Sequence, residues 1–141
     1  MNIDDEIKRV RDLVAAGKTS SEPDEALPKA PTIELIVNGE LYVDQVPEIG
    51  LKVGVDYDTM QTGQKFVLHL FSNTPSDGDY RSEPVTVNEV KPYVVTVPKE
   101  NIEKMHKNEL GLCLYFIDDK ETSNWTSFTV RWHLLSRTTV T

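Results

Sequence analysis

The chain has 141 residues, of which 38% are hydrophobic and 27% charged, and its formal net charge at pH 7 is −8. This size and composition suit one globular domain, and the negative charge disfavours nucleic acids and anionic membranes as partners. No apolar run approaches the ~20 residues of a membrane-spanning helix, and the charged start MNIDDEIKRVRD lacks the apolar segment of a secretory signal. The localisation therefore stays open between the cytoplasm and export by a non-Sec route.

An amphipathic helix is predicted over residues 1–16. Acids fill its first turn, where the helix dipole favours them, and its apolar residues recur at spacings of three and four: Ile3, Ile7, Val10 and Val14. A helix of this length is marginally stable alone in water, so the apolar stripe needs a surface to cover. We therefore expect these four residues to bind a partner surface, which is the neighbouring domain, a second copy of the chain or another protein.

A linker is predicted over residues 17–31, where three prolines stand among small and charged residues. Such a composition buries little apolar surface and favours a semi-extended chain. The strand pattern that follows is complete without residues 1–31. It therefore predicts that residues 32–141 fold on their own.

From residue 32 onward the hydrophobic period changes to two, the period of β-strands. TIELIV, LKVGV, KFVLHLF, YVVTV and LGLCLYFI are among the short β-prone runs, and sequences such as NGE, QTGQ and SNTPSDGD supply turns between them. We predict an all-β fold, a sandwich of about 7–8 antiparallel strands over residues 32–141. Pro98 occupies a first-turn position in PKENIEKMHKNEL, which predicts a short helical turn between two strands.

Alternation also assigns particular side chains to faces of the strands. Ile33, Leu35 and Val37 are expected on one face of the first strand. Trp132 alternates with apolar residues of the last strand and is expected in the core. The single cysteine, Cys113, is expected to be a small buried side chain.

Four stretches follow one another in an order that resembles a known family. They are VDYDTMQTGQKFVLHLF, with the pattern Met-x-x-Gly-x-x-apolar-x-Leu, then SEPVTVNEV, VTVPKENI and LYFIDDKETSNWTSFTV. Over roughly residues 41–132 they resemble the immunoglobulin-like repeat modules of large bacterial surface and secreted proteins. The resemblance implies an immunoglobulin-like sandwich without catalytic residues. Such modules usually form arrays, whereas this chain shows one module and no internal repeat.

The stretch YFIDDKETSNWTSF, residues 115–128, joins the last two predicted strands and carries most of the candidate ligand-binding residues. These are Asp118, Asp119, Asn124 and Trp125, with Tyr80 from an earlier loop. An exposed tryptophan beside polar side chains suits stacking on a sugar ring or anchoring of a protein partner. The alternative is that Trp125 folds over the end of the sandwich and shields the core.

Catalytic and metal sites are not expected from the sequence. His69, His106 and His133 are scattered, and neither a phosphate-binding loop nor a G-x-S-x-G turn occurs. One cysteine and three scattered histidines do not supply a zinc cluster, and the acids of residues 118–121 are fewer than the ligands calcium needs. We therefore predict no catalytic residues, no metal and no cofactor.

The sequence as a whole favours a non-catalytic binding module. We expect protein–protein recognition or assembly in a bacterial surface, secretion or phage-related context, through a protein partner or self-association at sandwich edges. The β-prone residues 134–141 would lengthen an edge strand or swap into a neighbour. One alternative is a carbohydrate-binding or adhesin-like domain that uses exposed tryptophan and tyrosine. A second alternative is a small hydrolase-like enzyme with a histidine and a carboxylate on its strands.

Overall fold

The computed structural model describes residues 3–16 and 27–133 of the chain. The predicted residues 17–26 of the linker and 134–141 of the C-terminus lie outside the described residues. In chain order the elements are α1 (Ile3–Ala15), β1 (Glu40–Tyr42), the 3-10 turn η1 (Val43–Gln45), β2 (Leu51–Val55), β3 (Lys65–Ser72), β4 (Tyr80–Arg81), β5 (Val85–Thr86), β6 (Tyr93–Val97), α2 (Lys99–Lys104), β7 (Leu110–Ile117), β8 (Glu121–Thr122) and β9 (Thr126–Arg131).

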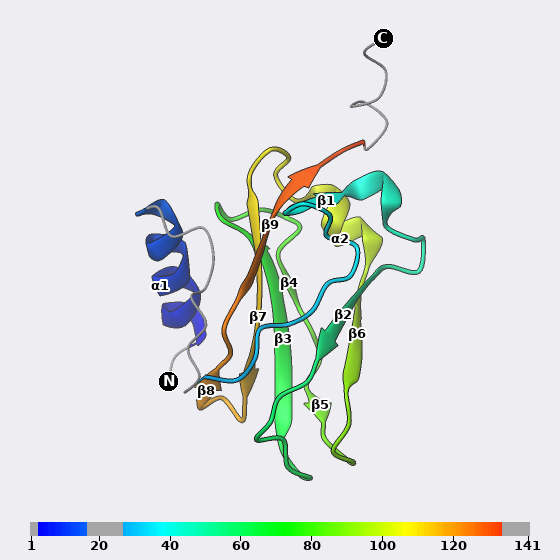
Figure 1. Ribbon diagram of the computed structural model, residues 1–141. Helices are drawn as coiled ribbons and strands as arrows, with labels where there is room; N and C mark the ends of the chain where they lie inside the picture. The colour runs from blue at the N-terminus through cyan, green and yellow to red at the C-terminus, as the bar shows by residue number, and fades with distance from the viewer. Residues whose placement is uncertain (1–2, 17–26, 134–141) are drawn as a thin grey trace.

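The strands form two sheets that face each other (Figure 1). The large sheet has the order β1-β9-β7-β3-β4, with β5 added beside β3 and β8 beside β7, and the small sheet is the antiparallel pair β2–β6. Helix α1 lies on the side of the large sheet that faces away from β2 and β6. The predicted all-β sandwich with a short N-terminal helix is confirmed, and α2 confirms the short helical turn between strands.

The start of the sandwich differs from the predicted first strand. Thr32 forms a bridge with Gly54 of the small sheet, and the chain then turns at Asn38 and Gly39, which have positive φ, and enters the large sheet as β1. Val37 is exposed on this turn, so the expectation of one continuous strand face is wrong. β1 pairs with β9 in parallel, so the prediction of antiparallel pairing throughout is also wrong. Alternation reports which face a residue occupies, but it does not report the direction of the neighbouring strand.

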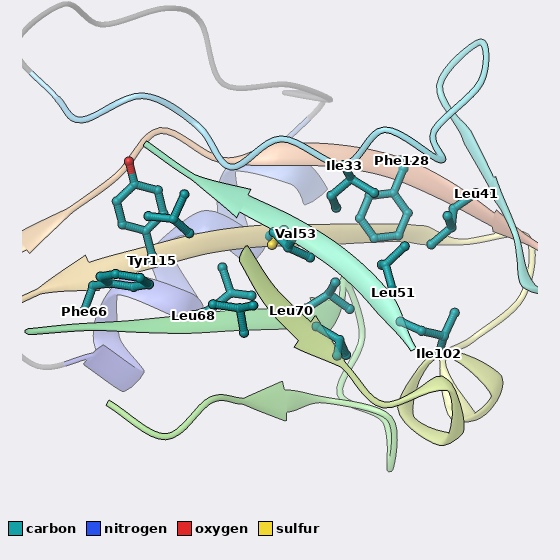
Figure 2. Close-up of a cluster of buried hydrophobic side chains, with 14 of the residues drawn as sticks. Ile33, Leu41, Leu51, Val53, Phe66, Leu68, Leu70, Ile102, Tyr115 and Phe128 are labelled. Atoms are coloured by element: carbon teal, nitrogen blue, oxygen red, sulfur yellow. The ribbon is translucent and has the colours of Figure 1, made fainter. Parts of the chain in front are cut away.

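The main core fills the space between the two sheets (Figure 2). Each sheet contributes the side chains on one face of its strands, and these side chains are buried at every second position: Leu51, Val53 and Val55 of β2, and Phe66, Leu68 and Leu70 of β3. Tyr115 of β7 and Phe128 of β9 complete the layer, and Cys113 is buried in the same cluster as predicted. Burial of this apolar surface is the main stabilising term of the sandwich.

A second core lies between α1 and the outer face of the large sheet. Val10 and Val14 of α1 are buried against Phe71, Leu112, Leu114 and Phe116, and Ile3 and Ile7 pack at the edge of this cluster. β7 is therefore covered on both faces, which explains its continuous apolar run. The predicted apolar stripe of the helix finds its surface within the same chain. Binding of a further partner by these residues stays a prediction.

Residues 28–31, which the sequence assigned to the linker, are hydrogen-bonded to the sandwich. The carbonyl of Pro28 accepts bonds from the backbone and the side-chain amide of Asn124. The carbonyl of Lys29 accepts the Tyr115 hydroxyl, and that of Pro31 accepts the Thr126 hydroxyl. This segment therefore runs beside the part of the large sheet that holds Tyr115, Asn124 and Thr126. In the described parts of the chain no helix is long and apolar enough to cross a bilayer.

Candidate functional site

The structure does not assemble the predicted ligand-binding residues into one exposed patch. Trp125 is half-buried, and its indole packs at the edge of the second core beneath α1. Asn124 is only 8% exposed and is held by Pro28. The tryptophan shields apolar surface, as the alternative predicted, but this surface is the outer face of the large sheet and not the space between the sheets.

The remaining predicted residues lie elsewhere on the sandwich. Asp118 and Asp119 form the turn between β7 and β8 with φ of 51° and 55°, and the Asp118 carboxylate accepts the backbone N–H of Lys65 at 2.9 Å. Tyr80 lies on β4, which β3 and β7 separate from β9 and Trp125. The two aspartates therefore have a role in turn geometry, and Tyr80 is at a distance from them.

Trp132 is not in the core, so that prediction is wrong. β9 ends at Arg131, and the Trp132 side chain beyond it is 48% exposed. Its ring stacks on His133, and the Lys107 ammonium lies 4.3 Å from the ring centroid. The alternation of the last strand stops one residue earlier than the sequence pattern indicates.

A cleft between α1 and the strands β3 and β4 is the best candidate site, and we call it the α1 cleft. Its volume is about 590 Å³, and it is lined by eleven residues: Asp4, Ile7, Lys8, Arg11, Asp12, His69, Phe71, Pro75, Asp79, Tyr80 and Arg81. A volume of this size lies in the range of small-ligand sites. Of the predicted residues, only Tyr80 and Ile7 reach it.

His69 is the buried polar group of the α1 cleft. It lies on the outer face of β3, is 5% exposed, and packs edge-on against Phe116 with 5.3 Å between ring centroids. Its Nε2 atom is buried and has no hydrogen-bond partner among residues 3–16 and 27–133. Burial, followed by the positive charge of Arg81, lowers the pKa of His69 from 6.5 to about 4, so the ring is neutral at pH 7.

Arg11 fixes the position of the helix over the cleft. Its guanidinium donates to the Ser72 carbonyl at 3.1 and 3.2 Å and to the Asp79 carboxylate at 2.9 Å, and it lies over the Phe71 ring. Asp79 in turn accepts the backbone N–H of Ser72. These charge-assisted bonds join α1 to the loop between β3 and β4 and form one rigid wall.

Lys8 and Arg81 are the other two cations of the cleft. Both are exposed, and neither forms a salt bridge with any of the residues that the structure describes. They stand near an apolar floor of Ile7 and Phe71, while Asp4 and Asp12 of α1 add acidic groups to the same lining. The arrangement offers an anion a cationic rim, a neutral imidazole and an apolar surface.

The sequence contained part of this site. Alternation in KFVLHLF puts His69 on the same strand face as Val67 and Phe71, but alternation does not show that α1 covers this face. The cationic residues come from a helix and from a strand that are far apart in the chain, so no spacing motif joins them. Among residues 3–16 and 27–133 no group of three or more His, Cys, Asp or Glu side chains is placed to hold a metal ion.

Comparison with known proteins gives a distant structural similarity. No protein-family model matches the chain, and no curated protein matches it. Among solved structures the chain is similar to a superoxide reductase (neelaredoxin) from Ignicoccus hospitalis, with 12% sequence identity and a TM-score of 0.40. The similarity covers 76% of this chain and 84% of that one.

This finding contradicts the functional expectation drawn from the sequence. The similar structure is named as an enzyme, whereas the sequence predicted a non-catalytic interaction module, with a carbohydrate-binding and a hydrolase-like domain as alternatives. That expectation rested on strand and turn patterns, which many β-sandwiches of unrelated function share. At this identity and TM-score the likeness transfers no activity, substrate or metal to the chain.

Proposed function

We propose that the α1 cleft binds a small organic anion with an apolar part, and that the function of the protein depends on this binding. The observation that carries the proposal is the buried Nε2 atom of His69, which lacks a hydrogen-bond partner in a cleft of about 590 Å³. A buried polar atom without a partner costs about 1–3 kcal/mol, so folds rarely keep one without a role. A perturbed pKa in a cleft is a further mark of functional sites.

The cleft lining is formally neutral, with Lys8, Arg11 and Arg81 against the three acids of the lining, Asp4, Asp12 and Asp79, so the anionic preference rests on the two cations that lack a salt bridge within the described parts of the chain. Arg81 and Lys8 have no salt-bridge partner among the described residues, whereas Arg11 and Asp79 satisfy each other. An anionic group beside Arg81 would gain a charge-assisted hydrogen bond, and the apolar part of the ligand would cover Ile7 and Phe71. Neutral His69 has one donor and one acceptor nitrogen, and the tautomer decides which of the two is Nε2. Because Nε2 is buried, the ring would turn toward the cleft to bond the ligand, and it would orient the ligand without adding charge.

The proposed fold family of the sandwich is immunoglobulin-like. The order β9-β7-β3-β4 and the pair β2–β6 correspond to the G-F-C-C′ order and the B–E pair of variable-type immunoglobulin domains, which supports the proposal. The small sheet differs from that pattern, because β5 pairs with β3 of the large sheet and not with β6. The proposal on the α1 cleft does not depend on this family assignment.

Benzoate is a suitable probe, because it joins a carboxylate to a small apolar ring. We expect titration of the full chain with benzoate to shift the NMR signals of the His69 ring and of the Arg81 backbone, with a Kd roughly in the millimolar range for so few ligand atoms. The substitution Arg81→Gln is expected to weaken binding about 10-fold, the value of one charge-assisted hydrogen bond.

Two controls make this titration decisive. Benzamide has the shape of benzoate without the charge and is expected to bind at least ~10-fold more weakly. Lys91→Gln removes an exposed cation next to β6, outside the α1 cleft, and is expected to leave benzoate binding unchanged. Equal binding of benzoate and benzamide, or benzoate shifts confined to residues outside the cleft, would refute the proposal.

A further inference from the structure

The small sheet has one covered edge and one free edge. β2 lies between Thr32, which bridges to Gly54, and β6. Along the opposite edge of β6, no strand or bridge among residues 3–16 and 27–133 pairs with it. β6 therefore presents one side of its backbone as an open edge, as Figure 1 shows on the side of the molecule opposite α1.

The hydrogen-bond pattern shows which groups face this edge. Gly54 donates its N–H to Thr32 and accepts the N–H of Thr32, at 2.8 and 2.9 Å, so neither of its backbone groups points to β6. Gly54 lies opposite Val94, and Lys52 lies opposite Thr96. In an antiparallel ladder such pairs alternate with hydrogen-bonded pairs, so the backbone N–H and C=O of Val94 and Thr96 point to the open edge.

The open edge has little of the usual protection against strand pairing, because the flanking prolines, Pro92 and Pro98, lie just outside the strand. Natural edge strands are commonly very short or carry charges, bulges or proline within the strand. The edges of the large sheet follow this rule, because β4 has only two residues and includes Arg81, while β1 has three and includes Glu40. β6 has five residues, Tyr93-Val-Val-Thr-Val97, with no charge among them.

The surface beside β6 joins apolar side chains to three charged ones, Glu34, Lys52 and Asp56. Val94 is 63% exposed on the outer face of the small sheet, next to a shallow groove of about 670 Å³ that Leu35, Pro47 and Pro92 also line. No helix of the described parts of the chain lines this groove, in contrast to the outer face of the large sheet under α1. Further strands on this edge would pair the backbone groups of β6 that the β2–β6 pair leaves open.

From these observations we infer that β6 pairs with β6 of a second copy of the chain, antiparallel and about a two-fold axis, to form one four-stranded sheet. With Val95 on the axis, Val94 of each copy exchanges backbone hydrogen bonds with Thr96 of the other. The strand that fits this edge must be extended, uncharged and free of proline over five residues, and β6 itself meets each requirement. An isologous contact of this kind closes at two copies.

The charges at the ends of β6 agree with this pairing. An acid–base pair precedes the strand, Glu89 with Lys91, and another follows it, Glu48 with Lys99. In an antiparallel dimer the start of one strand meets the end of the other, so two neutral pairs meet and not two like charges. The contact is small compared with the ~1,200 Å² of stable interfaces, so we expect a weak dimer with a Kd on the order of 100 μM.

Analytical ultracentrifugation of the full chain tests the inference. Over roughly 10 μM to 1 mM, which brackets the expected Kd, the weight-average mass should rise from that of a monomer toward that of a dimer. Val94→Pro removes an N–H that points to the open edge and is not used in the β2–β6 ladder. The weight-average mass of this variant should therefore stay that of a monomer, and its circular dichroism spectrum should match that of the wild type. Val94→Lys, which keeps the N–H and adds an edge charge, is the second variant and should weaken dimerisation at least ~10-fold.

Lys52→Thr, on the same outer face but on the inner strand β2, is the matched control and should dimerise as the wild type does. A wild-type chain that stays monomeric through the whole range would overturn the inference. So would a dimer that persists in Val94→Pro, or one that is lost only on substitution in α1, because the helix would then be the assembly element.

Discussion

His69 is a residue whose protonation the fold opposes. Its pKa is lowered from 6.5 to about 4 by burial and by the nearby Arg81 charge. Above pH 6.5 the ring is neutral in both the folded and the unfolded chain, so it has no effect on stability there. Between pH 6.5 and 4 the unfolded chain binds the proton and the folded chain does not. The free energy of unfolding therefore falls as the pH falls through this window, by about 3 kcal/mol in all.

Replacement of His69 by phenylalanine should remove this pH dependence. Urea unfolding of wild type and His69→Phe, measured from pH 7 to pH 4, should show a difference in free energy that grows in favour of the variant by about 3 kcal/mol toward pH 4. Carboxylates titrate near the same pH, but they contribute equally to both chains and cancel in the difference. His133→Gln is the control, because its side chain is 63% exposed. A difference that stays constant with pH would show that His69 is not held neutral.

Single residues show what the sequence could and could not predict at this scale. Cys113 was correctly assigned to the core, because a small apolar residue within an apolar strand has few other places. Trp125 and Trp132 both lie next to strand ends, where alternation no longer decides a side chain's surroundings. Their exposure depends on neighbours that are distant in the chain, such as α1 for Trp125 and Lys107 for Trp132.

Among the elements, the helix predicted over residues 1–16 is present as α1 (Ile3–Ala15) with its apolar stripe, because helical period is a local property. The surface that the stripe covers was not predictable, because it lies on β3 and β7. The two-sided burial of β7 was visible as a continuous apolar run, LGLCLYFI, but a buried helix or a strand in a parallel sheet gives the same run. The parallel pairing of β1 with β9 had no local signal.

Val10 is the residue that tests whether α1 is part of the core. It is buried against the outer face of the large sheet, so Val10→Ala should lower the free energy of unfolding by about 2 kcal/mol through the cavity it leaves. Urea unfolding followed by tryptophan fluorescence measures this, since Trp125 packs against the same cluster and Trp132 is exposed in the native state. Lys8→Ala, on the exposed side of the same helix, should change stability by less than ~0.5 kcal/mol. Equal effects of the two substitutions would mean that the helix is not docked in solution.

The described parts of the chain form three layers, which are α1, the large sheet and the small sheet (Figure 1). The sequence predicted the two sheets and the helix as separate parts. It did not predict that the large sheet is the middle layer, because alternation describes one buried face and the second buried face needs a partner from elsewhere in the chain. The α1 cleft exists only through this stacking, so the candidate site could not be predicted before the layers were known.

Deletion of residues 1–16 tests the division of the chain into a helix and an independent sandwich. The alternating pattern predicts that the sandwich folds without this segment, and the main core between the sheets is indeed complete without it. The structure adds a cost, because the deletion would expose Leu112, Leu114 and Phe116, which are buried under α1. We therefore expect the truncated sandwich to fold, with a free energy of unfolding lowered by roughly 3 kcal/mol after allowance for the entropy of ordering the helix. We also expect it to associate through the apolar face that the deletion exposes.

Circular dichroism, urea unfolding and light scattering of the truncated chain distinguish the outcomes of this deletion. A strand-rich spectrum with lowered stability and concentration-dependent scattering would support the three-layer arrangement. The association should persist in the double variant that also carries Val94→Pro, because the exposed face and the β6 edge lie on opposite sides of the molecule. If the truncated Val94→Pro chain is as stable and as monomeric as the full-length Val94→Pro chain, α1 does not cover the sheet. Complete loss of strand structure would show instead that α1 is required for the sandwich to fold.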